Sequence, residues 1–217
     1  MEYKVRILEI ELISHDVKMF VVEKPKGYSF IPGQNTKIKI EGYEKAKSFT
    51  MTSLPEDITL EFMIKIYPER DGFTKRIGEF KPGDSIVIED ASGSQAYKEK
   101  GAFIAAGTGI TPFIAISRRL RKDGKLKGNQ LILSNKTYDD VFNDVELKDM
   151  FRDKYVRVLT REEAEGFHYG RIDEEFLREQ IKDTGVYFYL CGPKIFCIEV
   201  RKILEKIGVE SDNILIW

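Results

Sequence analysis

The chain has 217 residues, and its 35 Lys plus Arg almost balance its 36 Asp plus Glu, so a charged surface for binding nucleic acid is not indicated. Hydrophobic residues make up 42% of the sequence, which is enough for one large core or two small ones. The two cysteines are too few for a disulfide framework or a four-thiolate iron-sulfur cluster, and the two histidines lie too far apart in sequence to indicate a zinc site. Any redox chemistry therefore needs a bound cofactor, and we expect no metal.

Residues 1–6 are charged and alternate in polarity, whereas a secretory signal needs a continuous apolar core. No stretch of the sequence reaches the apolar length that is needed to span a bilayer. We therefore expect a soluble cytoplasmic protein without membrane insertion.

The first half of the chain, up to about residue 89, consists of short runs rich in Val, Ile, Phe and Thr that often alternate with polar residues. Turn clusters at 24–27, 32–35 and 81–84 separate these runs. The pattern predicts an antiparallel Greek-key β-barrel, with a sandwich as the alternative. The expected strands are 3–13, 17–23, 36–40, 47–52, 58–66 and 85–88, and a short helix is expected at 73–77.

The run KSFTMTS at 47–53 offers a cation, a flat ring and hydroxyl groups along one predicted strand. A flavin needs a flat partner for its ring, a hydrogen-bonding group near its N5 atom, and cations or amides for its phosphates. Alternate residues of a strand face opposite sides, so Phe49 and Thr50 would flank a flavin whose edge lies along the backbone. The alternative is an ordinary barrel strand with one polar face.

The segment DGFTK at 71–75 predicts a turn, a helix start and a cation directly after the strand at 58–66. Its backbone amides could hold the second half of a dinucleotide. A capped helix on the protein surface is the alternative.

From Gly101 onward, apolar strands alternate with helical patterns, which predicts an α/β domain with a five-stranded parallel sheet covered by helices on both faces, in the manner of a Rossmann-like domain. The expected strands are 102–106, 130–134, 156–159, 186–190 and 214–216. The helix after Pro193 shows apolar residues at 3.6-residue spacing and has a stop signal at Gly208. A hydrophilic connector near 95–100 divides the chain into domains 1–98 and 99–217.

The motif GTGITP at 107–112 follows the first of these apolar strands and precedes a helix. Its two glycines permit a tight turn and close backbone approach, Thr111 can cap the helix and Pro112 can start it, so a pyrophosphate would meet free amides. The third glycine of the dinucleotide fingerprint is missing, and many tight turns share the remaining pattern.

Cys191, Gly192 and Pro193 stand at the end of another predicted parallel strand and open a helix in the same way. Ligands of such sheets bind outside the carboxyl ends of the strands, so the thiol of Cys191 is expected on the same rim as the 107–112 loop. The alternative for Cys191 is a buried, inert thiol.

With these residues in place, the chain resembles the ferredoxin-NADP reductase-like flavoprotein family over nearly its full length, and especially the small flavodoxin or ferredoxin reductases. The family's Arg-x-Tyr-Ser/Thr-x-x-Ser run stands here as KSFTMTS. Two positions depart from it, because Phe49 lacks the phenol hydroxyl and Lys47 lacks the guanidinium fork. We expect looser flavin binding or a different phosphate geometry as a result.

The resemblance implies FAD in the first domain and NAD(P)H in the second. It implies a catalytic role for Thr50, which would hydrogen-bond near flavin N5, and for Cys191, beside the nicotinamide. Trp217 would cover the other face of the flavin, unless it simply packs on the sheet edge or is exposed. The FAD residues implied are Lys47, Ser48, Phe49, Thr50, Gly72, Phe73, Thr74, Lys75 and Trp217. The nucleotide residues implied are Gly107, Thr108, Gly109, Thr111, Pro112, Cys191, Gly192 and Pro193.

The nucleotide preference depends on the residues that follow the strands ending near 134 and 159, because these are expected to meet the adenosine ribose. The candidates are Ser134, Asn135, Lys136, Thr160 and Arg161. Lys136 and Arg161 could bind a 2′-phosphate, which favours NADPH slightly, although both could equally be solvated surface charges. The residues do not separate FAD from FMN.

The resemblance implies hydride transfer from NAD(P)H to the flavin, followed by single electrons passed to a small carrier of the flavodoxin or ferredoxin type. The basic run at 118–122 would then end a helix on a solvated face, or steer an acidic carrier. Two alternatives are a non-catalytic flavin- or nucleotide-binding redox sensor and an electron-transfer subunit of a larger oxygenase or dehydrogenase complex.

Overall fold

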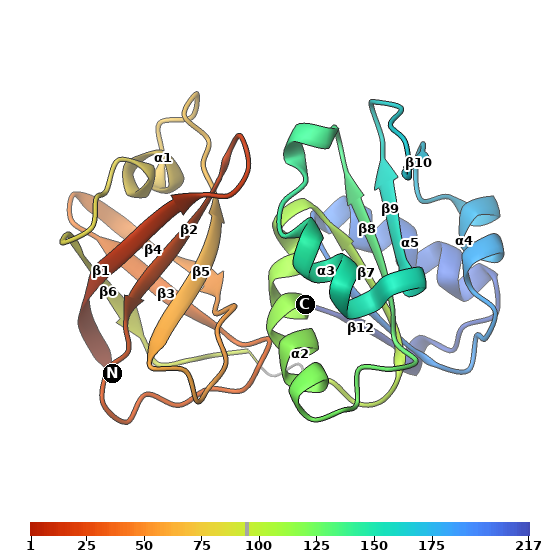
Figure 1. Ribbon diagram of the computed structural model, residues 1–217, viewed down its shortest axis with the longest axis horizontal. Helices are drawn as coiled ribbons and strands as arrows, with labels where there is room; N and C mark the ends of the chain where they lie inside the picture. Colours follow the sequence, from red (N-terminus) through yellow and green to blue (C-terminus); the bar gives the residue numbers. More distant parts are fainter. Residues whose placement is uncertain (94–95) are drawn as a thin grey trace.

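The computed structural model describes residues 1–93 and 96–217, so Gln95 of the predicted connector lies outside the described residues. The first half forms one antiparallel six-stranded sheet in the order β4-β3-β6-β1-β2-β5, and the second half forms a parallel sheet beside it (Figure 1). The barrel strands are β1 (Glu2–Leu12), β2 (Val17–Glu23), β3 (Asn35–Ile40), β4 (Tyr43–Thr50), β5 (Thr59–Lys65) and β6 (Ser85–Glu89), with the helix α1 (Phe73–Gly78) between β5 and β6. The predicted Greek-key β-barrel is confirmed.

The barrel forms because alternate residues of its strands are apolar and meet in one core. Phe20 of β2 pairs in register with Phe62 of β5, and both side chains are fully buried. The Thr52 amide donates to the Glu61 carbonyl oxygen at 2.8 Å, so the chain just beyond β4 pairs with β5 and brings the two edges of the sheet together. The strand predicted at 47–52 starts earlier than expected, at Tyr43, and ends at Thr50, so that Thr52 can make this closure.

The second sheet contains the five predicted parallel strands and a sixth at its edge, in the order β10-β9-β8-β7-β11-β12. The strands are β7 (Gly101–Ala106), β8 (Gln130–Asn135), β9 (Tyr155–Leu159), β10 (His168–Tyr169), β11 (Tyr187–Cys191) and β12 (Ile214–Ile216). The extra strand β10 has only two residues, both exposed, so no apolar pattern in the sequence predicts it.

Helices cover both faces of this sheet, because its strands bury side chains on both sides. On one face, α2 (Thr111–Lys122) and α3 (Asp144–Phe151) pack on residues such as Phe103 and Leu131. On the other face, α4 (Glu174–Gln180) and α5 (Lys194–Lys206) pack on residues such as Ile104 and Phe188. No helix of the part described is both long enough and apolar enough to cross a membrane.

The helix α2 lies between the parallel sheet and the barrel (Figure 1). Its Phe113 and Ile116 belong to a hydrophobic cluster that also includes Val17 and Met63 of the barrel. The two halves therefore share an apolar interface, and this interface holds the end of β5 near the carboxyl ends of the parallel strands.

Candidate functional site

The loop between β7 and α2 is shaped by its glycines. Gly107 has φ +53°, in the left-handed region that favours glycine. A Cβ atom on Gly109 would lie 2.4 Å from the Cys191 carbonyl oxygen, so only glycine lets the two loops approach this closely. The 107–110 segment is a 3-10 turn, and α2 follows it directly.

Thr111 and Pro112 are buried at the start of α2 rather than presented to a ligand. Pro112 begins the helix as predicted, because a first-turn residue needs no amide hydrogen. The prediction that Thr111 caps the helix is wrong: its hydroxyl donates to the Thr108 carbonyl oxygen at 3.0 Å, and the N-cap position belongs to Ile110. Thr111 therefore stabilises the 3-10 turn.

A cleft of about 510 Å³ lies where the carboxyl ends of the parallel strands face the barrel. It brings together ten of the residues that were candidates for the nucleotide. It also includes two barrel residues, Lys65 at the end of β5 and Tyr67 just beyond it. The lining residues are Lys65, Tyr67, Ala106, Gly107, Thr108, Gly109, Ser134, Asn135, Lys136, Asp140, Thr160, Cys191, Gly192 and Pro193.

Asn135 is the clearest polar group offered by this cleft. It is only 7% exposed, and its Oδ1 atom has no hydrogen-bond partner within the described part of the chain. A buried acceptor without a partner costs free energy, so this atom is suited to a ligand that donates a hydrogen bond, such as a ribose hydroxyl.

Lys136 follows Asn135 and lines the cleft, whereas Arg161 is exposed and is not among the lining residues. The two residues are nevertheless neighbours, because the Arg161 amide donates to the Lys136 carbonyl oxygen at 2.9 Å. The Thr160 amide binds the Asn135 carbonyl oxygen at 3.0 Å in the same way, so the loops after β8 and β9 are held side by side.

Cys191 lines the cleft with a neutral thiol. Burial raises the pKa of the Cys191 thiol to about 12, with a smaller contribution from nearby Cys197. At neutral pH the thiol is therefore neither a nucleophile nor an anion beside the nucleotide.

The predicted flavin strand places Phe49 half-buried at the margin of the barrel core, with its ring centroid 5.6 Å from that of Phe73. Lys47 and Ser48 are exposed and Thr50 is half-buried. Lys47 and Lys75 form no ion pair within residues 1–93 and 96–217, so both ammonium groups are available to an anion.

The segment 72–75 is the start of α1, as the sequence predicts, but the helix has only six residues. Gly72 precedes it in an extended conformation, and Phe73 is buried in the barrel core. Thr74 and Lys75 are half-buried. The first turn contains no acidic residue that would repel a phosphate.

Trp217 lies in the interface between the two halves. Its ring centroid is 5.6 Å from Phe113 of α2 and 5.8 Å from Tyr189 of β11, and its amide donates to the Leu190 carbonyl oxygen. The indole Nε1 is buried without a hydrogen-bond partner among the described residues and approaches the backbone at Gly33 of the barrel.

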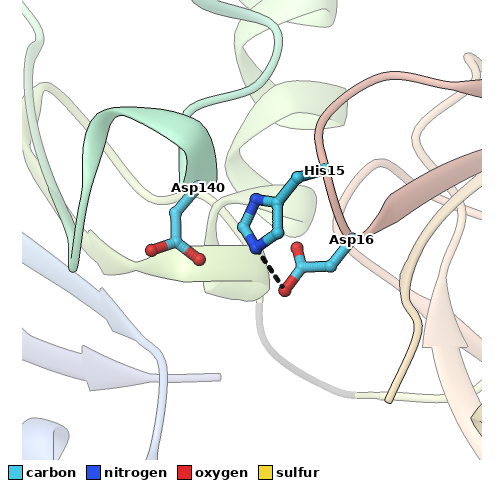
Figure 2. Close-up of side chains that lie close together, drawn as sticks. All are labelled: His15, Asp16 and Asp140. Atoms are coloured by element: carbon cyan, nitrogen blue, oxygen red, sulfur yellow. Dashed lines mark ion pairs between the residues drawn. The ribbon is translucent and has the colours of Figure 1, made fainter. Parts of the chain in front are cut away.

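A cluster of charged residues at the barrel side of the cleft was not predicted (Figure 2). Lys65 Nζ lies 2.6 Å from Asp16 Oδ2 and 2.9 Å from Asp140 Oδ1, so it joins the β1–β2 turn to the segment after β8. His15 Nε2 lies 3.3 Å from Asp16 Oδ2, and its Nδ1 is 2.7 Å from the Asp139 carbonyl oxygen. His15, Asp16 and Asp140 could each offer a ligand atom to a metal, but the ammonium of Lys65 already supplies a cation to both carboxylates.

The basic run at 118–122 was predicted to lie on a solvated face or to steer a carrier, and the solvated face is wrong for Arg118 and Arg119. Arg118 and Arg119 form ion pairs with Glu61 and Glu56 of the barrel. The error has a simple cause: a sequence shows which residues are charged, but not that α2 faces a second domain.

Two family models match the chain in order. The model for the oxidoreductase FAD-binding domain covers residues 4–97, and the model for the oxidoreductase NAD-binding domain covers residues 103–202. A relative, NADH-cytochrome b5 reductase 1 of Eremothecium gossypii, is 32% identical over 200 residues, which span 82% of this chain and 69% of that protein. The chain belongs to the ferredoxin-NADP reductase-like family of flavoproteins.

Other members differ in length and context. Cytochrome b5 reductase 4 of Bos taurus is 28% identical over 97% of this chain, which spans only 46% of that protein. The FAD/NAD-binding domain of the Vibrio cholerae nitric oxide dioxygenase superposes with a TM-score of 0.89 at 24% identity, covering 99% of this chain and 97% of that one. A ferredoxin NADP+ reductase of Neisseria gonorrhoeae gives a TM-score of 0.87 at 18% identity, covering 100% and 98%. These last two structural similarities show that the chain has the same fold as those proteins.

The comparisons identify the protein as an oxidoreductase with one FAD-binding and one NAD-binding domain, and so as a flavoprotein of electron transfer. Sequence reasoning missed Lys65, Tyr67 and Asp140 as lining residues of the cleft. Lys65 and Tyr67 come to the cleft only through the contact between the two halves, and Asp140 lies in a short 3-10 segment after β8 that carries no apolar pattern.

Proposed function

We propose that this protein accepts a hydride from NAD(P)H on bound FAD and delivers single electrons to a small protein carrier of the flavodoxin or ferredoxin type. The observation that supports this most strongly is the cleft itself, in which the end of barrel strand β5 faces the loops after β7, β8 and β11. A nucleotide in this cleft would touch both halves of the molecule. The proposed flavin and nucleotide domains are 1–98 and 99–217.

The residues present fit a nicotinamide dinucleotide. The glycine-shaped turn at 107–110 offers backbone to a pyrophosphate at the start of α2, and Asn135 offers a buried acceptor to a ribose hydroxyl. Gly192 and Pro193 continue the same rim next to Cys191. We propose that these residues, with Thr108, Ser134 and Thr160, bind and orient the nucleotide.

The residues present also fit a flavin. Phe49 offers a ring at the margin of the barrel, and Lys47 and Lys75 offer cations that form no ion pair with the other described residues. When bound, FAD would supply a hydride acceptor that can afterwards release electrons one at a time. We propose that Phe49 holds the flavin ring, that Lys47, Ser48 and residues 72–75 hold its phosphates, and that Trp217 lies at its nicotinamide side.

Two residues would act at the reacting atoms. Thr50 is half-buried, and its hydroxyl forms no hydrogen bond with the other described residues. We propose that it donates a hydrogen bond to the flavin ring. Cys191 would present a neutral, polarisable thiol to the nicotinamide, since its pKa is raised to about 12. Neither residue needs to transfer a proton during hydride transfer, because the step moves a hydride directly between two bound rings.

The nucleotide preference is the finer part of the proposal. Lys136 lines the cleft and Arg161 lies next to it, which favours the 2′-phosphate of NADPH. Asp140 opposes this preference as a carboxylate in the same cleft, but Lys65 binds it. We propose NADPH as the better donor.

The second candidate function is the reductase component of a larger oxygenase system. It is favoured by relatives whose names state that role, such as the reductase component of propane 2-monooxygenase from Rhodococcus jostii, 26% identical over 98% of this chain, which spans 62% of that protein.

The test is to load the purified protein with FAD or FMN, remove free flavin, and follow flavin absorbance under anaerobic NADPH and NADH separately. We expect retention of FAD and rapid bleaching, faster with NADPH. Reoxidation by added flavodoxin or ferredoxin supports the carrier, whereas reoxidation only by an oxygenase component supports the second candidate. A protein that retains FAD but is not bleached by either nucleotide would be a sensor.

A further inference from the structure

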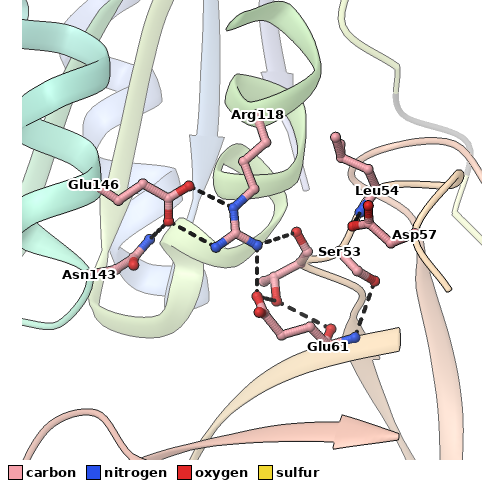
Figure 3. Close-up of polar contacts among 8 residues, drawn as sticks. Ser53, Leu54, Asp57, Glu61, Arg118, Asn143 and Glu146 are labelled. Carbon is pink, nitrogen blue, oxygen red and sulfur yellow. Dashed lines mark hydrogen bonds and ion pairs between the residues drawn. The ribbon is translucent and has the colours of Figure 1, made fainter. Parts of the chain in front are cut away.

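Arg118 of α2 joins the two halves of the protein through a single guanidinium (Figure 3). Its Nη1 donates to the Thr52 carbonyl oxygen at 2.9 Å and to Glu61 Oε1 at 2.7 Å, both in the barrel. Its Nε and Nη2 donate to the two carboxylate oxygens of Glu146 on α3, at 2.7 and 2.8 Å. The planar fork of arginine makes this arrangement possible, and the single ammonium of a lysine could not reproduce it.

The guanidinium lies between two carboxylates in a largely buried place. The Arg118 side chain is 23% exposed, and those of Glu61 and Glu146 are 19% and 29% exposed. Burial opposes the charge of Arg118, but the two carboxylates outweigh burial and raise its pKa. Burial likewise opposes the charge of Glu146, and the hydrogen bonds from Arg118 outweigh it and lower that pKa.

Glu146 is itself held in place. Asn143 Nδ2 donates to Glu146 Oε2 at 2.8 Å from the N-cap position of α3 (Figure 3). Asn143 has φ +57°, a left-handed conformation that asparagine tolerates better than most residues. The carboxylate that orients Arg118 is therefore preorganised by the nucleotide-binding half.

On the barrel side, Arg118 binds the point where the chain leaves β4 and pairs with β5. The Thr52 amide donates to the Glu61 carbonyl oxygen at 2.8 Å, and the Thr52 hydroxyl donates to Glu61 Oε1 at 2.7 Å. Thr52 lies two residues beyond Thr50. Arg118 thus contacts the same segment that would hold the flavin.

The same helix also begins at the nucleotide loop. The residues 107–110 lead directly into α2, and Arg118 lies about two turns further along the helix. Because a helix is rigid over this length, any movement of Thr52 relative to Arg118 changes the distance from the flavin strand to the nucleotide loop.

We propose that Arg118 is a positioning residue for hydride transfer, which sets the distance between the flavin-binding strand and the nicotinamide-binding loop. This inference rests on the proposed function. It assigns Arg118 no contact with either cofactor, only control of how closely the two rings approach.

Arg119 provides a matched control. It is the next residue of α2, and it forms ion pairs with Glu56 of the barrel and with Asp123. It therefore also crosses the domain interface, but it has no hydrogen bond to Thr52 or Glu61 among the described contacts. Arg119→Met removes an interface ion pair without touching the flavin strand.

The first test needs no cofactor. Hydrogen exchange of the full-length chain is compared between Arg118→Met and Arg119→Met. We expect faster exchange of the amides of Thr52 and Glu61 in Arg118→Met only. Equal protection of these amides in both variants would show that Arg118 does not hold the strand, and the inference would fall.

The second test is single-turnover reduction of the FAD-loaded protein by NADPH deuterated at the transferred position. In Arg118→Met we expect the reduction rate constant to fall by about 10- to 100-fold, nucleotide affinity to change little, and the isotope effect to become more temperature-dependent. Arg118→Lys should recover thermal stability but not the rate, which a purely structural role would not predict.

The outcomes separate the two proposals. If wild type is reduced and Arg118→Met and Arg118→Lys match Arg119→Met in rate and isotope effect, the positioning role is wrong and the proposed function stands. If NADPH and NADH fail to reduce the wild-type flavin, the proposed function is wrong, and the positioning role for hydride transfer falls with it. The exchange result then still reports whether Arg118 holds the strand.

Discussion

The nucleotide cleft is shaped mainly by backbone, whereas the proposed flavin surface is shaped mainly by side chains. In the cleft, Gly109 approaches the Cys191 carbonyl so closely that a Cβ atom has no room. On the flavin surface, a Cβ on Gly72 would meet its nearest atom at an ordinary 3.9 Å. Small changes in the cleft should therefore disturb the whole site, while changes on the barrel should weaken only the group that is altered.

The largest effect is expected for Gly109→Ala. The new methyl group would overlap Cys191 and Gly192, so the two loops must separate, and we expect reduction by NADPH to slow by roughly 100-fold. Stopped-flow reduction measures this. The matched variant Gly72→Ala should leave the melting temperature unchanged. If both variants had equal effects on the reduction rate and on the melting temperature, the two regions would not differ in the way described.

A smaller effect is expected for Phe49→Ala, because the flavin ring loses its aromatic partner while the barrel keeps Phe73. Aromatic contacts of this kind are worth about 0.5–1.5 kcal/mol, so the dissociation constant of FAD should rise up to about tenfold. Fluorescence titration of the flavin-free protein measures it. Phe49→Tyr should bind FAD at least as tightly as wild type, and unchanged affinity in Phe49→Ala would place the flavin elsewhere.

Lys136→Met tests the nucleotide preference. If Lys136 meets a 2′-phosphate, the variant should lose about tenfold in kcat/KM for NADPH and almost nothing for NADH. The exposed Lys127, at the opposite end of β8, serves as control. An equal loss of kcat/KM for both nucleotides would mean that Lys136 does not bind the 2′-phosphate.

The domain interface should weaken in acid. Burial raises the pKa of Asp140 and of Glu146, but hydrogen bonds from Lys65 and Arg118 respectively outweigh it, so both values lie below the ordinary range. Their contribution to stability is therefore complete only above the ordinary carboxyl range, at about pH 5.5, and is lost as the pH falls through the lowered values. Urea unfolding across this range should show the loss, and Arg118→Met should show less of it. A transition between pH 6 and 8 would point to another group.

The smallest effect is expected for Cys191→Ala. Because the thiol pKa is about 12, the group is neutral throughout the neutral range and contributes shape rather than charge. We expect kcat to change by no more than about threefold, with a flat profile from pH 6 to 9. A strong loss of activity with an acidic limb near neutrality would show that a thiolate acts in the reaction.

In both regions, the sequence predicted the parts that depend on local pattern. The glycine turn at 107–110 and the rim at 191–193 lie within short segments at strand ends, so local patterns located them, and the structure brings them together in one cleft. The barrel strands were predicted for the same reason, by local alternation and turns. Elements that are determined by neighbouring residues in the chain can be predicted from the sequence.

The sequence did not predict the roles of residues whose contacts lie in the other half of the molecule. Lys65 and Asp140 approach one another only because the barrel packs against α2 and β8, and Arg118 was assigned to a solvated face for lack of that information. The two-residue strand β10 was missed because two exposed residues contain no periodicity. For Lys65, Asp140 and Arg118, what the sequence lacks is a contact between segments far apart in the chain.

The central claim is that a flavin held by the barrel receives a hydride from a nucleotide held by the cleft. The most direct measurement is anaerobic mixing of the FAD-loaded protein with NADPH or NADH in a stopped-flow spectrometer. The account predicts that bound FAD is bleached within a single turnover, faster by NADPH, and that Gly109→Ala slows this step. A protein that takes up no flavin, or whose bound flavin neither nucleotide reduces, would contradict it.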